Sequence, residues 1–383
     1  MTARPDLARA RRWVVKLGSG VLSGGQARLD PKALGRLAGE LGELRAQGRE
    51  VVLVSSGAIL AGSGLLDLKP RTTQLKQAAA AVGQSRLMRA WEEAFARERG
   101  AVAQVLLTRE DVRHRRRYLN ARNTILALLR LGVVPVINEN DTVAVEEIRF
   151  GDNDVLSALV AGLCDADLLV LLTDQEGLYS SDPRREPGAL LIRRVEPGRP
   201  GPACGGAAAG PSSQALGLGR PGPTGSGGME SKVQAARMAA RSGIPCVIAS
   251  GLRAGVLGEI LQGREVGTLF SPSPKPMAKR RAWLAFASHP RGQIHVDPGA
   301  REALTSSRSL LPSGVRTVSQ GFEAGDVVSL VCEGLEFARG LTNYGSRDLE
   351  RIKGLRTSQI EAVLGAKPAD EVVHRDNLAL LQS

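Results

Sequence analysis

Short apolar runs alternate with helical patterns of apolar residues from Arg12 to about Ser250, and this alternation constrains the fold more than any other feature of the chain. The predicted strands span residues 13–17, 50–55, 102–107, 133–137, 168–173 and 245–249, and the predicted helices span 31–47, 72–98, 116–131, 154–164 and 230–242. Several strands are apolar at nearly every position, as strands buried on both faces of a sheet are. Strands alternating with helices predict a mostly parallel sheet covered on both sides, which is a three-layer αβα sandwich of the α/β class.

A second, smaller unit is predicted after a Pro-rich stretch. Residues 271–276 read Ser-Pro-Ser-Pro-Lys-Pro, so we place a linker at 272–278 between a first domain at 9–271 and a second at 279–360. Short strand-like runs at 283–286, 292–296, 314–318, 327–331 and 337–342 predict a small C-terminal β-barrel, and a tail follows at 361–383. Residues 197–224 are crowded with Gly, Ala, Pro and Ser, and we expect a mobile loop there within the first domain.

The charge of the chain leaves several functions open. The sequence holds 51 Lys and Arg residues against 39 Asp and Glu residues, a net charge of +12, and residues 1–141 hold 24 against 13. A basic chain attracts nucleic acids, but it equally suits an enzyme with anionic substrates. Aromatic residues make up only 3% of the chain, which leaves few side chains for stacking on single-stranded bases.

Composition also bears on the compartment. Cys164, Cys204, Cys246 and Cys332 lie far apart with no Cys-x-x-Cys pair, which argues against a zinc site and a disulfide framework and favours a reducing compartment. No apolar run approaches the ~20 residues that a membrane-spanning helix needs. The Arg-rich start leads into Trp13-Val14-Val15 without the apolar core of a secretory signal. We therefore expect a cytoplasmic protein with no membrane partner.

Two glycine-rich segments carry lysines. Lys16-Leu17-Gly18-Ser19-Gly20 ends the first predicted strand, where backbone N–H groups and a lysine suit a phosphate. The motif fits neither the Rossmann nor the Walker A pattern, and a plain strand-to-helix turn explains it equally well. Gly225-Ser-Gly-Gly-Met-Glu-Ser-Lys232 opens a predicted helix, whose first turn is an anion site. Together the two lysines predict a pair that brackets a transferred phosphoryl group.

Polar clusters follow other predicted strands. Ser55-Ser56-Gly57-Ala58 ends the second strand, Asn138-Glu139-Asn140-Asp141 ends the fourth, and Thr173-Asp174 ends the fifth. Ligands of parallel sheets gather at the carboxyl ends of the strands. A further cluster, Gly151-Asp152-Asn153-Asp154, precedes a helix. Its carboxylates and amide suit gripping an ammonium group, orienting lysines or positioning Mg²⁺, and capping of the helix by Asp152 or Asp154 is the alternative interpretation.

The order of these motifs resembles that of the amino acid kinase family, and within it the members that phosphorylate the γ-carboxylate of glutamate in proline synthesis. The resemblance also includes Ala-Ala-Val-Gly-Gln-Ser-Arg-Leu at 80–87 and Leu-Leu-Thr-Arg at 106–109. It covers about residues 12–195 and 225–270, while residues 279–356 resemble a PUA domain. It implies the amino acid kinase fold followed by a PUA-like β-barrel.

The resemblance implies a role for each matched position. Lys16 and Lys232 would neutralise the transferring phosphoryl group, and Asp154 would hold both lysines in place. The implied glutamate-binding residues are Ser56, Gly57, Ala58, Asn138, Asp141, Asp152 and Asn153. The implied nucleotide-binding residues are Lys16, Gly18, Thr173, Asp174, Ser226, Gly227, Gly228, Met229, Glu230, Ser231 and Lys232. The implied reactants are L-glutamate and ATP with Mg²⁺ on its phosphates and no metal-ligating side chains, in a homo-oligomer (dimer or tetramer) inhibited by proline.

Two alternative functions stay open at this point. One is an RNA-binding protein that acts through its PUA-like tail. Residues 277–383 hold 14 basic against 12 acidic residues. This small excess of positive charge disfavours a nucleic-acid partner, because contacts with phosphates dominate the affinity of such binding. The other is a kinase of another acidic small molecule, such as aspartate. The sequence departs from the family at 197–224, where a better-patterned, helix-forming stretch is usual, and at Ser226, where the family has Thr.

Overall fold

The computed structural model describes residues 4–98, 100–143, 153–184, 186, 188–197, 228–274, 281, 284–285, 290–319 and 321–381. The chain forms two compact units, Met1–Pro276 and Met277–Ser383. Each unit has its own sheet and its own hydrophobic core. The expected mobile loop at 197–224 lies, except for its first residue, outside the described residues, as does part of the expected linker.

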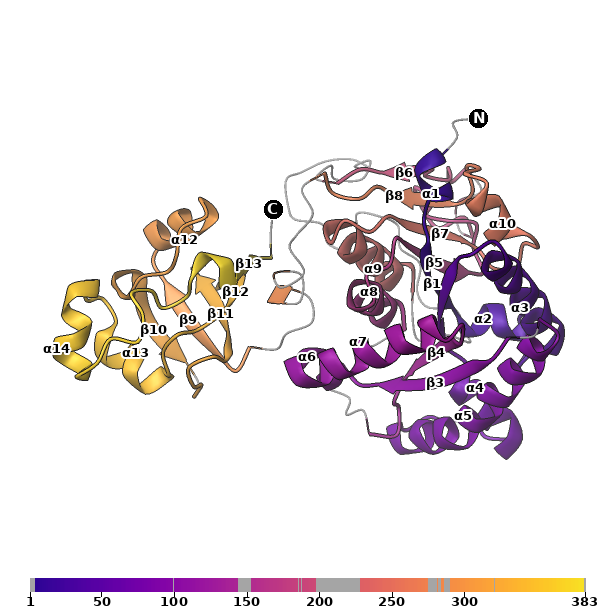
Figure 1. The fold of residues 1–383 in the computed structure, drawn as a ribbon, viewed down its shortest axis with the longest axis horizontal. Coiled ribbons are helices and arrows are strands. Elements are labelled where there is room, and N and C mark those ends of the chain that lie inside the picture. Colours follow the sequence, from indigo (N-terminus) through magenta and orange to yellow (C-terminus); the bar gives the residue numbers. More distant parts are fainter. Residues whose placement is uncertain are drawn as a thin grey trace. The chain divides into compact units, whose positions relative to one another are not determined.

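An eight-stranded sheet forms the centre of the first unit, with the order β3-β4-β2-β1-β5-β7-β8-β6 (Figure 1). Its strands are β1 (Arg12–Leu17), β2 (Glu50–Ser55), β3 (Val102–Leu107), β4 (Val134–Glu139), β5 (Leu168–Thr173), β6 (Arg194–Val195), β7 (Cys246–Ser250) and β8 (Thr268–Phe270). Neighbouring strands are parallel except β7 and β8, which are antiparallel. The prediction of a mostly parallel sheet is therefore confirmed, and the two short strands β6 and β8 are additions to it.

Helices cover both faces of this sheet, as the three-layer prediction requires (Figure 1). One layer contains α2 (Ser19–Ser23), α3 (Pro31–Ala46), α4 (Ala58–Leu66), α5 (Thr73–Ala96) and α10 (Val256–Leu261). The other contains α7 (Arg115–Arg130), α8 (Asn153–Leu163) and α9 (Met229–Arg241), and the described part of the unit also holds two short helices, α1 (Pro5–Ala8) and α6 (Arg109–Arg113). The long helices begin where the sequence caps them: Asp30 accepts the Lys32 N–H at 3.0 Å, and Thr72 accepts the Leu75 N–H at 3.3 Å.

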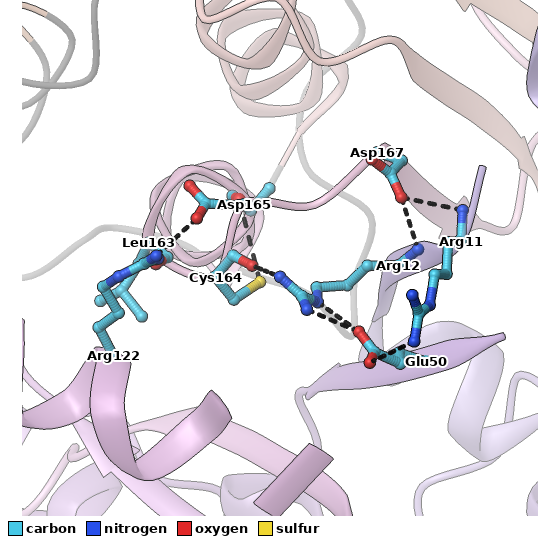
Figure 2. Close-up of polar contacts among 9 residues, drawn as sticks. Arg11, Arg12, Glu50, Arg122, Leu163, Cys164, Asp165 and Asp167 are labelled. Atoms are coloured by element: carbon cyan, nitrogen blue, oxygen red, sulfur yellow. Dashed lines mark hydrogen bonds and ion pairs between the residues drawn. The ribbon is translucent and has the colours of Figure 1, made fainter. Parts of the chain in front are cut away.

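The amino-terminal end of β1 is fixed by a charged cluster (Figure 2). Asp167 accepts the backbone N–H groups of Arg11 and Arg12 at 2.9 and 2.8 Å. The Arg12 guanidinium lies 2.7 Å from the Glu50 carboxylate and donates to the carbonyl oxygen of Cys164. These contacts join β1, β2 and the turn before β5, so they hold the central strand in register at the end opposite to Lys16.

The second unit contains a five-stranded sheet with the order β10-β9-β11-β12-β13. Its strands are β9 (Gly292–Val296), β10 (Val315–Ser319), β11 (Val327–Cys332), β12 (Leu335–Leu341) and β13 (Leu378–Leu380), and the α-helices α12 (Pro298–Thr305), α13 (Ser346–Ile352) and α14 (Ile360–Leu364) lie among the described residues that follow β9. The expectation of a small β-rich unit is confirmed. The strand expected at 283–286 is wrong at Leu284 and Ala285, which lie in a helical segment and pack against Val327 and Ala379.

Two thiols of the first unit are buried in its interior. Cys164 and Cys246 have no exposed surface. Burial raises the pKa of the Cys164 thiol from its ordinary value of 9.0 to about 12, and it raises the pKa of Cys246 well above the ordinary value.

Among the described residues, no helix combines the length and apolar character needed to cross a membrane.

These thiols are expected to resist alkylation in the native protein. The thiolate is the reacting species, and burial both removes the thiolate and blocks access. At pH 8, iodoacetamide should therefore label the Cys164 and Cys246 peptides at least 100-fold more slowly in buffer than in guanidinium chloride, as measured by mass spectrometry. Equal rates in the two solvents would contradict the burial of these residues.

Candidate active site

Three charged side chains from distant parts of the sequence meet at the carboxyl end of the first sheet. Lys16 lies on β1, Asp154 lies in the first turn of α8, and Lys232 lies in the first turn of α9. The Lys16 Nζ is 2.5 Å from Asp154 Oδ1, and the Lys232 Nζ is 3.1 Å from Asp154 Oδ2. Asp154 is fully buried, and both lysines are buried. The three groups together carry one net positive charge in a poorly hydrated position, which is the electrostatic character that a phosphoryl group needs.

Further hydrogen bonds hold the Asp154 carboxylate and its helix in place. The Ser231 hydroxyl lies 2.8 Å from Asp154 Oδ2 and 2.9 Å from the Gly228 carbonyl oxygen. The Ser157 hydroxyl donates to the Asp154 carbonyl oxygen at 2.5 Å. A buried carboxylate that lost one of its cations would still keep the other cation and this hydroxyl, so its position does not depend on either lysine alone.

A second group of polar side chains lies at the carboxyl ends of β2 and β4. The Asn153 Nδ2 donates to the Ser56 hydroxyl and to Asn138 Oδ1, both at 2.9 Å. Gly57, which separates Ser56 from α4, has φ +110°, a conformation that glycine adopts without strain. Asn153 and Asp154 are adjacent at the start of α8, so this amide group and the lysine pair share one helix terminus.

The expected nucleotide-binding residues lie at the ends of β1, β5 and α9. A Cβ atom placed on Gly18 would lie 3.9 Å from the Lys16 ammonium, so the backbone of this turn runs beside the lysine. The Thr173 hydroxyl donates to Asp174 Oδ1 at 3.0 Å, and the Arg184 guanidinium lies 3.0 Å from Asp174 Oδ2. The other expected nucleotide-binding residues that the structure describes lie at the start of α9, where Gly228 is the N-cap and Met229, Glu230 and Ser231 begin the helix.

The remaining expected residues are only partly described by the structure. Asp152, Ser226 and Gly227 lie outside the described residues. Asp141 lies two residues beyond β4 and is partly buried, and Ala58 is the buried first residue of α4. In the described part of the chain, no group of three or more His, Cys, Asp or Glu side chains is placed to hold a metal ion.

Two neighbours of the site were not predicted from its motifs. Gln84 on α5 accepts a hydrogen bond from the Asn138 Nδ2 at 2.9 Å, and Arg184 pairs with Asp174. Gln84 could have been found from the sequence, because helical spacing places it on the same face of α5 as Leu87 and Trp91. A buried amide among apolar residues needs a hydrogen-bond partner. No pattern in the sequence indicated Arg184.

Comparisons with known proteins agree with this architecture. A model of the amino acid kinase family matches residues 11–250, and a model of the PUA domain matches residues 292–364. A glutamate 5-kinase from Myxococcus xanthus is 53% identical over 384 residues and covers 99% of both chains. A glutamate 5-kinase from Pelobacter propionicus is 51% identical over 385 residues, covering 97% of this chain and 98% of its own. The chain therefore belongs to the amino acid kinase family and, within it, to the group of the glutamate 5-kinases.

Proposed function

We propose that this protein transfers the γ-phosphoryl group of ATP to the γ-carboxylate of L-glutamate, giving L-glutamyl 5-phosphate, the first step of proline biosynthesis. The observation that carries the proposal is the convergence of Lys16 and Lys232 on the two oxygens of the buried Asp154. Nearly full-length likeness to glutamate 5-kinases favours this activity over the two alternatives, an RNA-binding protein and a kinase of another acidic small molecule.

The chemistry requires positioning and charge rather than a base. A glutamate carboxylate has a pKa of about 4.3 and is ionised at neutral pH, so no proton must be removed before attack. A carboxylate oxygen attacks the γ-phosphorus, the bond to the β,γ-bridging oxygen breaks, and ADP leaves with the electron pair. Negative charge spreads over the transferred oxygens in this step, and fixed cations stabilise it. We assign this task to Lys16 and Lys232, with Asp154 as their common positioning residue.

The polar group beside the lysines is assigned to glutamate. Ser56 and Asn153 offer a hydroxyl and an amide, and Asn138 orients the amide. Asp141 and Asp152 would add carboxylates, which favour the α-ammonium group. Gly57 and Ala58 line this turn with little side-chain bulk.

The remaining residues are assigned to ATP. The N-terminus of α9, with Gly228, Met229, Glu230 and Ser231, presents backbone N–H groups to a phosphate. Ser226 and Gly227 would extend this loop, and Gly18 would let a phosphate approach the β1 turn. Thr173 and Asp174 would contact the ribose or base.

Magnesium fits the site as part of the nucleotide. The Asp154 carboxylate already lies against two ammonium groups and a hydroxyl, and the described residues offer no other carboxylate cluster. We therefore assign Mg²⁺ to the ATP phosphates, where it supplies charge neutralisation.

Purified protein should form hydroxamate when it is incubated with L-glutamate, MgATP and hydroxylamine, which traps acyl phosphates. We expect no product without glutamate, ATP or Mg²⁺, and at most a few per cent with L-aspartate or N-acetylglutamate in its place. Equal activity with either substitute would contradict the substrate assignment.

Three further properties belong to the same proposal: a cytoplasmic location, a homo-oligomer (dimer or tetramer) and feedback inhibition by proline. Repeating the hydroxamate assay with added L-proline tests inhibition, and sedimentation analysis tests the oligomer.

A further inference from the structure

A chain of side-chain amides runs from the α5 helix to the site assigned to glutamate. The Gln84 Oε1 accepts from the Asn138 Nδ2 at 2.9 Å, and the Asn138 Oδ1 accepts from the Asn153 Nδ2 at 2.9 Å. At the far end, the Gln84 Nε2 lies 3.4 Å from Gln104 Oε1 on β3. Gln84 and Asn138 are buried, so water does not compete for the hydrogen bond between them, whereas Asn153 is half-buried and Gln104 is exposed. Neither α5 nor β3 holds a residue assigned to the site. The chain of amides therefore connects these two elements to Asn153.

A backbone contact fixes the direction of every amide in this chain. The Glu139 N–H donates to the Asn138 oxygen at 2.9 Å, and a backbone N–H can only donate. The other end of the Asn138 amide must therefore be its NH₂ group, which faces Gln84. Gln84 must in turn present its oxygen, because two NH₂ groups cannot bond to each other. The amide orientations thus follow from hydrogen-bond chemistry and not from the placement of atoms alone.

The consequence reaches Asn153. Its NH₂ group has two hydrogens, and they go to the Ser56 hydroxyl and to Asn138 Oδ1. Its oxygen is buried and has no hydrogen-bond partner among the described residues. An amide flip would face the Asn138 oxygen with another oxygen, so Asn153 is held as a hydrogen-bond acceptor. A buried acceptor of this kind calls for a donor, and the α-ammonium group of an amino acid is the donor that the proposed substrate brings.

We infer that Gln84 is a positioning residue for substrate recognition: it holds Asn138, and through Asn138 it keeps the Asn153 oxygen turned to accept a hydrogen bond from the α-ammonium group of glutamate. The inference rests on the proposed function. It explains why a polar side chain stands on the apolar face of α5, beside Leu87. Gln84 itself need not touch the substrate. Its effect is on selectivity for an amino acid over a dicarboxylate without an amino group.

The test compares binding of L-glutamate with binding of glutarate, which has both carboxylates and no amino group. Gln84→Met keeps the size of the side chain and removes the acceptor. We expect the Kd for glutamate, measured by calorimetry, to rise about tenfold and the Kd for glutarate to stay within twofold. A residue that served only to pack α5 would weaken both ligands together or neither. Either of those results would overturn the inference.

Two further variants sharpen the result. In the Asn153→Ala background, Gln84→Met should cause no additional loss of glutamate affinity, because the Asn153 oxygen through which Gln84 acts is gone. Additive losses of affinity would contradict a path from Gln84 through Asn138 to Asn153. Gln84→Glu keeps an acceptor for Asn138 and should keep at least the wild-type preference for glutamate, which also covers the case in which Gln84→Met does not fold. A wild-type protein that binds no glutamate would overturn the proposed function together with this inference. If the wild-type protein is active and Gln84→Met changes the Kd for glutamate and the Kd for glutarate equally, the inference alone would be overturned.

Discussion

The Lys16→Met substitution is expected to lower kcat by about 10²- to 10³-fold while leaving the KM for glutamate within a few-fold of wild type. Lys16 is assigned to charge that develops on the transferred phosphoryl group, so its loss weakens the transition state more than the bound substrates. The variant should still fold, because Asp154 keeps Lys232 at 3.1 Å and the Ser231 hydroxyl at 2.8 Å. Removing Asp154 would instead leave two buried cations facing each other, which makes it a poorer test.

A matched control lies on the same strand. Arg12→Met removes a cation from the amino-terminal end of β1, where the guanidinium pairs with Glu50 (Figure 2). This variant should lose some stability and keep a kcat within about twofold of wild type, because Arg12 lies at the opposite end of the strand from Lys16. The hydroxamate assay at saturating ATP and glutamate measures both variants. A folded Lys16→Met protein with normal turnover would contradict the assignment of Lys16.

The central layer of the first unit was predictable because its strands are apolar at most positions and are bounded by glycine or polar residues. β1, β2, β3 and β5 begin and end within one residue of the prediction. Helix α4 was not predicted. It follows a Gly-containing turn directly, and its own two glycines, Gly62 and Gly64, have poor helix propensity, so tertiary packing and not local preference makes it helical.

The site was predictable in part. The sequence places Lys16, Ser56, Asn138 and Thr173 at strand ends, and parallel pairing brings strand ends to one edge. Nothing in the spacing shows that Asp154 contacts Lys232, 78 residues away; that expectation came from resemblance to a family. The orientation of the Asn153 amide could not come from sequence at all, because it depends on one backbone N–H of Glu139.

A close crossing of α4 and α5 supports the turn that carries Ser56. A Cβ atom added at Gly83 would lie 1.8 Å from the Ala58 carbonyl oxygen and 2.4 Å from the Gly62 nitrogen. A Cβ atom at Gly62 would lie 1.8 Å from the Ala79 carbonyl oxygen. The two helix backbones therefore touch, and no flexible side chain can move aside to relieve an added methyl group. Either glycine could be replaced only if the helices moved apart.

Gly83→Ala is accordingly expected to lower the free energy of unfolding by about 3 kcal/mol. It should also raise the KM for glutamate, because the methyl group presses on Ala58, two residues after Ser56, and because Gln84 is the next residue along α5. Urea denaturation followed by tryptophan fluorescence reports on this unit, since Trp91 lies on α5 with its ring nitrogen 3.0 Å from the Ser55 hydroxyl.

Gly162→Ala is the matched control for this experiment. Gly162 is also a helix residue, in α8, but a Cβ atom there would have nothing within 4 Å. Alanine has the higher helix propensity, so this variant should be as stable as wild type or more stable, by up to about 1 kcal/mol. The difference between the two Gly→Ala changes isolates the helix crossing from helix propensity. Unfolding of Gly83→Ala and Gly162→Ala at the same urea concentration would show that α4 and α5 are not in backbone contact, and the geometry around Ser56 would then need another support.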